Sequence, residues 1–503
     1  MMKQVDCFSI LIIYNKKEVV GMKLIKLLEG IEYSGVVLDS EISFLTCDSR
    51  QVKEGCVFAC LKGVNCDGHD YAIKASQLGA SAVLVERDMG VASQIIVDNT
   101  HAAYAKMCAN FYSNPAQKLK FIGVTGTNGK TTVTNILKNI LSMENKKVGL
   151  IGTIQNEIGD MIIKTDKTTP NHLEYQKLLK DMVDGGCEYV VMEVSSHALE
   201  QHRIADTKFE IGVFTNLSQD HLDYHETMEN YYLAKKKLFD VSQAAVICVD
   251  DEYGKRLSKE VSCSTITFSA GGYVSDYSAS DISINADGVK YKLTGENNSE
   301  QICFSTPGMF SVHNSMAAAI VGFLLGFNAE NVAKNIANCN PVKGRSENIP
   351  TDRDFYVICD YAHSPDGLKN ILDSINSYSK GRVVTLFGCG GDRDKTKRPI
   401  MGEVAAKNSD FLIVTSDNPR TEDPDSIIED IIVGVEKEGK PYVKITDRKE
   451  AIKYALENAQ KNDIILLAGK GHEDYQIVGK KKINMDERTI VKEILNDLDK
   501  SGI

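Results

Sequence analysis

The sequence predicts an α/β protein with three domains, and three observations support this prediction. A chain of 503 residues is too long for one hydrophobic core, because domains usually contain about 100 to 200 residues. Residues 121 to 131 read as an apolar strand that enters a glycine-rich loop, and an amphipathic helix follows. Elsewhere, apolar strands alternate with helices in two separate series, which is typical of parallel sheets.

We expect domain boundaries near residues 98 and 341. Residues 1–98 contain short strands and one helix, from Tyr71 to Gly79. Residues 99–341 contain the glycine-rich loop, with strands expected at 189–194, 210–217 and 244–249 and hairpins between 262 and 305. Residues 342–503 form a second, Rossmann-like series, with strands expected near 355–359, 382–387, 411–415 and 463–468.

The first 21 residues fit no folded or exported pattern. Their apolar run is too short to span a bilayer, and no small-residue cleavage site follows it. The sequence predicts an amphipathic helix from Met22, so we expect translation to begin there and residues 1–21 to be a spurious extension.

Composition excludes several classes of protein. A net charge of −11 argues against a general nucleic-acid surface, which needs clustered Lys and Arg. The 13 cysteines are scattered without a pair at zinc-binding spacing, which favours a reduced, cytoplasmic protein. We therefore expect no nucleic-acid partner. We also expect small-molecule ligands, no membrane insertion and a monomer.

The glycine-rich loop predicts a phosphate-binding site. Glycines let backbone N–H groups approach an anion, and the helix N-terminus adds partial positive charge. Lys130 can reach the terminal phosphates of a nucleotide, and Thr131 can bind Mg²⁺. Val124 replaces the first glycine of the common phosphate-loop pattern, so this loop is the tighter Thr-Gly-Thr-Asn-Gly-Lys-Thr variant.

Polar residues at strand ends extend this prediction, because ligands of parallel sheets bind beyond the carboxyl ends of strands. Glu193 ends one strand, where its carboxylate could bind the same Mg²⁺, and His197 follows it. Another strand leads to the segment Asp220-His221-Leu222-Asp223-Tyr224-His225, which helix caps and surface charge could also explain.

Five motifs together resemble those of Mur ligases, in the same order. They are Thr-Gly-Thr-Asn-Gly-Lys-Thr, Met-Glu-Val-Ser-Ser-His, Thr-Asn-Leu-Ser-Gln-Asp-His-Leu-Asp-Tyr-His, Asp-Tyr-Ala-His-Ser-Pro-Asp and Gly-Cys-Gly-Gly-Asp-Arg-Asp. The resemblance runs from about Met22 to the end. It is strongest to the members that add the third residue of the peptidoglycan stem peptide to UDP-N-acetylmuramoyl-L-alanyl-D-glutamate.

This resemblance implies an ATP- and Mg²⁺-dependent ligase that forms an acyl phosphate. It implies catalytic roles for Lys130, Glu193, His221 and Lys235, and metal binding by Thr131, Glu193, His221 and a CO₂-derived carbamate on Lys235. Three consecutive lysines compete for that role, and we choose Lys235 by its distance from His225. The implied ATP-binding residues are Thr125, Gly126, Thr127, Asn128, Gly129, Lys130, Thr131, Thr132, Asn314, Arg345, Asp360 and His363. Ser346 stands where many relatives have Met.

The resemblance also implies a site for the UDP-sugar peptide, with the first domain binding its UDP part. The implied residues are Ser49, Val64, Asn65, Cys66, Thr168, Thr169, Ser195, Gln201 and Arg203.

The acceptor is expected to be meso-diaminopimelate. Arg420 ends the segment Asp-Asn-Pro-Arg, and a guanidinium group matches the second carboxylate that diaminopimelate has and lysine lacks. The resemblance implies acceptor binding by Arg393, Asp417, Asn418, Pro419, Arg420, Gly469 and Glu473. An ordinary turn with an exposed arginine would also explain Asp-Asn-Pro-Arg.

Other functions remain open at this point. They are a lysine-adding Mur ligase, a ligase similar to folylpolyglutamate synthetase, and a nucleotide-binding switch without turnover. Retention of Lys130, Glu193, His221 and Lys235 together argues against the switch.

Overall fold

The computed structural model describes residues 21–63, 66–165, 167–285, 287–296 and 298–501. The proposed extension therefore lies almost entirely outside the described residues, as do Val64 and Asn65. Contacts divide the chain into two compact units, which we describe one at a time. None of the helices in the described ranges is both long enough and apolar enough to cross a membrane.

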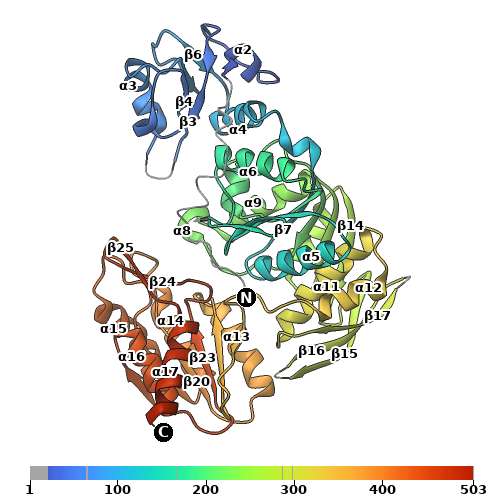
Figure 1. Cartoon of the computed structure of the whole chain (residues 1–503), viewed down its shortest axis with the longest axis vertical. Helices are drawn as coiled ribbons and strands as arrows, with labels where there is room; N and C mark the ends of the chain where they lie inside the picture. The colour runs from blue at the N-terminus through green and yellow to red at the C-terminus, as the bar shows by residue number, and fades with distance from the viewer. Residues whose placement is uncertain (1–20, 64–65, 166, 286, 297, 502–503) are drawn as a thin grey trace. The chain divides into compact units, whose positions relative to one another are not determined.

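The first unit contains residues 21–119, 170–184 and 197–207. Its main sheet has four parallel strands in the order β3-β4-β5-β6. These strands are Phe44–Thr46, Cys56–Ala59, Ala82–Val85 and Gln94–Ile96. Helix α3 (Ala72–Gln77) agrees with the helix expected there, and α4 (Thr100–Phe111) packs its buried side chains into the core of this sheet (Figure 1). The boundary at residue 98 stays a prediction.

The helix expected from Met22 is wrong at its start. Met22–Lys23 forms a short strand, β1, which pairs with β2 (Glu41–Ile42). Helix α2 covers only Leu24–Leu27, after Lys23 in an extended conformation. Leu24, Leu27 and Leu28 are buried, so tertiary packing and strand pairing decide the conformation of this segment more than helical periodicity does.

A sheet of eleven strands forms the first part of the second unit. Its order is β10-β9-β8-β11-β7-β12-β13-β14-β15-β16-β17, and the pairs from β8 to β15 are parallel. The strands in chain order are Lys120–Thr125 (β7), Val148–Ile151, Asn156–Ile158, Met161–Ile163, Tyr189–Glu193, Phe209–Phe214, Ser242–Cys248, Ser264–Ser269, Tyr277–Asn285, Gly288–Thr294 and Ser299–Phe304 (β17). The expected strands at 189–194, 210–217 and 244–249 are confirmed within a few residues.

The expected hairpins between 262 and 305 also form, as antiparallel strands β15, β16 and β17. They continue the edge of the parallel sheet and do not make a separate insertion (Figure 1). Alternating hydrophobicity explains this arrangement, because Tyr291, Leu293 and Ile302 turn into the core while their neighbours face solvent.

Helix α5 (Lys130–Met143) packs beside α11 (Met309–Leu324) and α12 (Ala329–Ala337). The apolar face predicted from helical spacing is buried in this core: Val133, Ile136, Leu137, Ile140 and Leu141. This packing anchors the helix that begins at the glycine-rich loop.

A six-stranded sheet, ordered β18-β19-β23-β20-β21-β22, completes the second unit. Its strands are Glu347–Ile349 (β18), Tyr356–Asp360 (β19), Val383–Phe387 (β20), Phe411–Val414 (β21), Tyr442–Lys444 (β22) and Ile464–Ala468 (β23). All pairs are parallel except β18 with β19. The four predicted strands are confirmed, whereas the short edge strands β18 and β22 were not anticipated.

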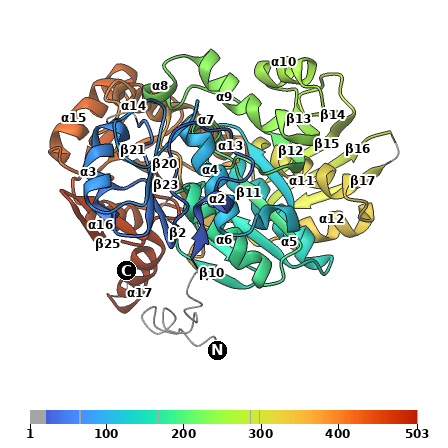
Figure 2. The same ribbon diagram turned by 90° about the horizontal axis from the view of Figure 1, so that it is seen from above.

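Helices cover both faces of this sheet, as a Rossmann-like series requires. The helices α13 (Pro365–Tyr378), α14 (Lys397–Lys407) and α15 (Pro424–Val435) contribute to one core. The helices α16 (Arg448–Glu457) and α17 (Glu487–Ser501) pack together in the other (Figure 2). A hairpin of β24 (Tyr475–Val478) and β25 (Lys481–Asn484) follows β23.

Candidate active site

The glycine-rich loop joins β7 to α5 and is held by the end of the neighbouring strand β12. Gly126 and Gly129 have φ angles of 148° and 90°, values that side chains rarely tolerate. Thr215 donates its hydroxyl to the carbonyl of Asn128 at 2.6 Å, and the Asn128 N–H donates to the Asn216 side chain at 2.9 Å. The loop is therefore fixed before any ligand binds.

The ammonium group of Lys130 folds back onto this loop. It donates to the carbonyl oxygens of Gly126 at 2.9 Å and Thr127 at 2.8 Å. Arg345 reaches the start of α5 from the chain segment before β18, and it donates to the Thr131 hydroxyl at 3.2 Å. Two cationic side chains thus lie beside a helix N-terminus, which is an arrangement suited to phosphate groups.

Glu193 ends β11, and only 1% of it is exposed. Its two carboxylate oxygens accept hydrogen bonds from the backbone N–H and the hydroxyl of Thr153, both at 2.8 Å. No ion pair to Glu193 occurs within the described part of the chain. A buried carboxylate without a cationic partner, beside the Thr131 hydroxyl, is a suitable ligand pair for Mg²⁺.

A cavity of about 900 Å³ brings many of the predicted nucleotide residues together. The predicted residues that line it are Thr127, Asn128, Gly129, Lys130, Thr131, Thr132, Thr168, Glu193, His221, Asn314, Arg345, Asp360 and His363. Thr125 and Gly126 are buried and do not line it. Tyr361 does line it, with its ring 4.8 Å from the Arg345 guanidinium, and sequence reasoning missed this residue.

Asp360 ends β19 with both carboxylate oxygens occupied by backbone donors. The N–H groups of Ser346 and Ala362 donate to it at 2.7 Å and 2.8 Å. Burial raises the pKa of Asp360, although Arg345 opposes that shift. Ser346 is buried and has a φ angle of 46°, and the hydrogen bond from its N–H to Asp360 holds it in this position.

Lys235 differs clearly from the two lysines that follow it on α9 (Met228–Asp240). It is 2% exposed, and its ammonium donates to the Gly126 carbonyl at 2.8 Å. Burial holds the pKa of Lys235 well below its ordinary value, and the charge of Lys130 adds to this effect. Lys236 instead forms a partly exposed ion pair with Glu260 at 2.8 Å, while Lys237 is only partly buried.

His221 begins the short helix α8 (Leu222–His225) and lines the cavity with a φ angle of 54°. Its ring lies 6.1 Å from the Tyr231 ring, and the Lys235 ammonium lies 4.5 Å from the same ring. Both residues thus approach Tyr231, whose hydroxyl lies 3.3 Å from the Thr127 hydroxyl.

A second cluster lies at the carboxyl ends of β21 and β23. The Lys470 ammonium is fully buried and donates to the Asn418 side-chain oxygen at 2.9 Å and to Glu473 Oε2 at 2.5 Å. Asn418 donates its amide to the same Glu473 oxygen at 2.9 Å. These contacts leave Oε1 of Glu473 as the oxygen available to a ligand ammonium group. Sequence reasoning identified Asn418 and Glu473 but missed Lys470, which its place between two glycines after a strand could have signalled.

The arginines predicted for the acceptor lie beside this cluster on neighbouring loops. Arg420 has a φ angle of 51° and donates from Nη1 to the Gly391 carbonyl at 2.8 Å. Arg393 is exposed on the loop after β20. Asp417 and Pro419 are buried, and Gly469 packs so closely to Asp417 that an added Cβ would lie 2.8 Å from the carboxylate.

The residues predicted to bind the UDP-sugar peptide divide between the two units. In the first, Ser49 starts a 3-10 turn capped by Asp48, and Cys66 is exposed. The Gln201 side-chain oxygen there accepts two hydrogen bonds from Arg203, at 2.9 Å and 2.7 Å. In the second, the Thr169 hydroxyl donates to the Glu193 carbonyl at 2.9 Å and lies 3.3 Å from the Ser195 hydroxyl.

Comparison with known proteins decides the family. Models of the Mur ligase family catalytic domain, middle domain and glutamate ligase domain match residues 41–120, 124–322 and 344–471. A UDP-N-acetylmuramoyl-L-alanyl-D-glutamate--2,6-diaminopimelate ligase of Caldanaerobacter subterraneus subsp. tengcongensis is 48% identical over 95% of this chain and 100% of its own length. This chain belongs to the Mur ligase family.

Two further relatives are similar over their whole length. A Mur ligase of Clostridium acetobutylicum with the same name, numbered 1, is 44% identical over 95% of this chain and 100% of its own. A solved structure of UDP-N-acetylmuramoyl-L-alanyl-D-glutamate--2,6-diaminopimelate ligase is 31% identical, with a TM-score of 0.69 and coverage of 95% of this chain and 99% of that one. The predicted three-domain α/β architecture is thus confirmed as that of a Mur ligase.

Proposed function

We propose that this Mur ligase joins meso-2,6-diaminopimelate to the D-glutamate of UDP-N-acetylmuramoyl-L-alanyl-D-glutamate, with hydrolysis of ATP to ADP and phosphate. This reaction belongs to peptidoglycan precursor synthesis. The full-length relatives at 44% and 48% identity carry the name of this activity. The structural observation that carries the proposal is the cluster of Arg420, Asn418, Lys470 and Glu473, because it offers separate positive and negative groups to a doubly zwitterionic acceptor.

The reaction has two steps, formation of an acyl phosphate and attack on it by the amine. A carboxylate oxygen of the D-glutamate attacks the γ-phosphorus of ATP, and ADP leaves with the bond between the β- and γ-phosphates broken. The free amine of the acceptor then attacks the acyl carbon, phosphate leaves, and the amine loses a proton. Enzymes that transfer phosphoryl groups act mainly through positioning and electrostatic stabilisation, and the loop residues fit that role.

Each loop residue has a defined part in this proposal. The N–H groups of the loop and the N-terminus of α5 bind the phosphates, while Lys130 leaves the Gly126 and Thr127 carbonyls to contact the terminal phosphate. Arg345 binds the same phosphates from the other side of Thr131. Thr131 and Glu193 hold Mg²⁺, which when bound neutralises charge on the phosphate oxygens.

The low pKa of Lys235 supports the proposed carbamate. Only a neutral amine reacts with CO₂, and burial together with the charge of Lys130 favours that neutral form. The carbamate would convert a buried cation into an oxygen ligand. Lys236 is instead paired with Glu260 at 2.8 Å.

Acceptor selection rests on a charge match. The Arg420 guanidinium would bind the distal carboxylate of diaminopimelate in a two-pronged contact, and Oε1 of Glu473 would bind the distal ammonium group. Lysine has that ammonium but no distal carboxylate. Binding lysine would therefore leave Arg420 without its partner.

Product mass spectrometry tests the activity. The full chain is incubated with UDP-N-acetylmuramoyl-L-alanyl-D-glutamate, ATP and Mg²⁺, with meso-diaminopimelate, L-lysine, L-ornithine or L-glutamate as the acceptor. We expect the tripeptide product with diaminopimelate and ADP release only when all three substrates are present. A preferred lysine product would refute the acceptor assignment, and ADP release without either co-substrate would refute the ligase reaction.

We also propose that the enzyme works as a cytoplasmic monomer. Every proposed substrate contact comes from a single chain, so no second copy is needed to complete a site. Light scattering after size-exclusion chromatography, with and without ATP, measures the molar mass directly, and a stable dimer would overturn this part of the proposal.

A further inference from the structure

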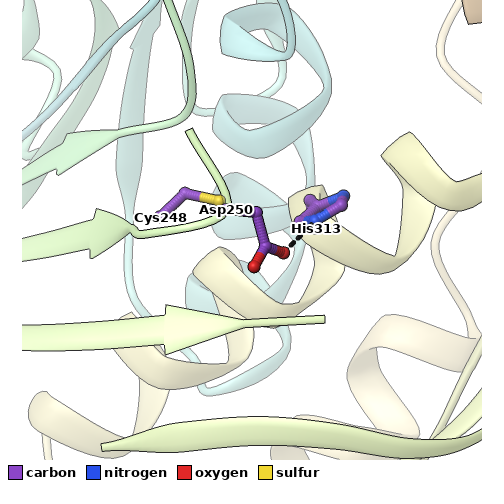
Figure 3. A group of neighbouring side chains, drawn as sticks. All are labelled: Cys248, Asp250 and His313. Atoms are coloured by element: carbon purple, nitrogen blue, oxygen red, sulfur yellow. Dashed lines mark hydrogen bonds and ion pairs between the residues drawn. The ribbon is translucent and has the colours of Figure 1, made fainter. Parts of the chain in front are cut away.

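Three side chains of different chemistry, Cys248, Asp250 and His313, meet at the cavity. Cys248 ends β13, Asp250 follows two residues later, and His313 lies in the first turns of α11 (Figure 3). One potential ligand atom from each lies within 4.8 Å of the other two. All three residues line the cavity, so an ion can enter from it.

The contacts of His313 indicate that a proton or a metal ion lies between its ring and Asp250. Nδ1 lies 3.0 Å from the Met309 carbonyl, which can only accept, so Nδ1 carries a hydrogen. In the neutral ring, Nε2 then presents a lone pair to Asp250 Oδ2, only 2.6 Å away. Two acceptors at this distance repel unless a proton or a metal ion lies with them. A backbone carbonyl on one ring nitrogen is also the usual support for a histidine that binds metal through the other.

The surroundings of Asp250 orient its carboxylate toward this histidine. Its Oδ1 accepts from the Ser269 hydroxyl, and its Oδ2 accepts from the N–H groups of Ala270 at 2.8 Å and Gly271 at 2.9 Å. These contacts hold the carboxylate in place beside His313.

Cys248 supplies the third donor. It is 3% exposed, and burial raises the pKa of its thiol to about 12. That shift makes the free thiol a poor nucleophile, which argues against a catalytic Cys-His-Asp triad. A soft divalent cation still displaces the thiol proton, because a thiol that binds zinc is deprotonated.

We propose that Cys248, Asp250 and His313 form a zinc site with its fourth position open to the cavity. Sulfur, imidazole and carboxylate donors suit zinc, whereas Mg²⁺ prefers oxygen ligands and keeps its water. The Asp250 and His313 atoms need to separate by less than about 1 Å for both to lie ~2 Å from one tetrahedral ion. The site is distinct from the pair Thr131 and Glu193.

Two measurements on the metal-free full chain test the site. Calorimetric titration with zinc chloride, in millimolar Mg²⁺ throughout, is expected to give one high-affinity site. Its affinity should rise with pH, because binding releases the Cys248 proton. Titration with Co²⁺ is expected to give the intense absorption of a thiolate bound to a tetrahedral ion. Absence of zinc binding would mean that a proton alone joins His313 and Asp250 and would overturn the proposal.

Matched variants locate the bound ion. Cys248→Ser and His313→Gln are each expected to weaken zinc binding at least tenfold, and Cys248→Ser to abolish the thiolate absorption of Co²⁺. Cys303→Ser, which removes an exposed cysteine on β17, is expected to change neither signal. Glu193→Gln is also expected to leave zinc binding unchanged, and a loss there would place the ion at the magnesium pair and refute the new site. Thermal unfolding of each variant establishes that it is folded.

Discussion

At the scale of single residues, burial separates chemically identical side chains into different roles. Lys235, Lys236 and Lys237 are adjacent on α9, yet only Lys235 turns into the interior and meets the glycine-rich loop. Lys130 donates to the same Gly126 carbonyl, so two ammonium groups approach one oxygen. Charge repulsion and burial both favour a neutral Lys235, which a modified lysine requires.

The first prediction concerns Lys235 and its neighbour. Lys235→Ala is expected to lower kcat by about two to three orders of magnitude, since removal of one preorganised electrostatic group costs about 3–4 kcal/mol. Lys236→Ala, which loses only a partly exposed pair with Glu260, is expected to stay within a few-fold of the unmodified enzyme. Steady-state ADP release measures both, and added formate or acetate should restore part of the Lys235→Ala activity. Similar losses in the two variants would contradict the choice of Lys235.

Arg420 provides the second prediction at this scale. Leaving a charged group unpaired in a closed site costs about 2–5 kcal/mol, and 1.4 kcal/mol corresponds to about tenfold. Arg420→Ala should thus lower kcat/KM for meso-diaminopimelate by roughly two orders of magnitude or more, while kcat/KM for lysine, which we expect to be low already, changes much less.

A control is needed because Arg420 has a φ angle of 51°, which alanine tolerates poorly. Arg420→Asn keeps that backbone conformation and still removes the guanidinium group. Both variants should show the same selective loss, with KM for ATP unchanged. Equal losses for lysine and diaminopimelate would mean that Arg420 organises the site generally and does not read the distal carboxylate.

At the scale of elements, both candidate sites arise where parallel strands end beside one another. The ends of β7, β11 and β12 bring the loop, Glu193 and Thr215 together. The loops after β21 and β23 bring Asn418 together with Lys470 and Glu473. Because these residues come from different strands, their geometry depends on the register of each sheet.

The third prediction tests the link between the loops after β21 and β23. Lys470→Met keeps the approximate length of the side chain but removes the ammonium group that donates to Asn418 and Glu473. Breaking a buried ion pair on one side typically costs about 3–5 kcal/mol, so chemical denaturation should detect a less stable C-terminal sheet.

The same variant should raise KM for diaminopimelate by at least tenfold and leave KM for ATP unchanged. The matched control is Lys482→Met, in the exposed strand β25 of the adjacent hairpin, which should alter neither constant. A Lys470→Met enzyme that loses stability but keeps its KM for diaminopimelate would show that Lys470 acts only as a structural support.

At the scale of the whole molecule, the fourth prediction concerns acid stability. His172, in α6 (His172–Asp184), is 4% exposed, and its Nε2 lies 2.9 Å from the Gln201 carbonyl. Burial lowers its pKa from 6.5 to about 3, and the nearby His101 adds to the shift. Below pH 6.5 the unfolded chain therefore binds a proton that the folded chain excludes.

The direction in which stability changes with pH follows from this difference in proton binding. Stability from His172 is fully present above pH 6.5 and falls by about 1.4 kcal/mol for each pH unit below it, until pH approaches 3. Urea unfolding at pH 7.5, 6.5 and 5.5 should show this loss, and His172→Gln should flatten the slope whatever its effect at pH 7.5. An unchanged slope in the variant would show that His172 is not the group responsible.

The sequence alone determined the family, the parallel-sheet architecture and most of the predicted residues that line the candidate cavity. It could do so because the glycine-rich loop, its Lys-Thr pair and the following apolar helix face are local features, in which a few neighbouring residues carry the whole signal. Glu193 was also predictable, since a strand end is visible as the end of an apolar run. Helical periodicity failed at Met22, because pairing with residues from Glu41 onward outweighs a short local preference.

Only the tertiary structure distinguished similar residues by their surroundings. Burial on α9 distinguishes Lys235 from Lys236, and sheet register places Lys470 between Asn418 and Glu473. The cluster of Cys248, Asp250 and His313 is invisible as a spacing pattern, since a strand end and a distant helix supply its members. Burial, charge repulsion and ligand geometry depend on distances between segments that folding brings together, and the order of residues along the chain does not encode those distances locally.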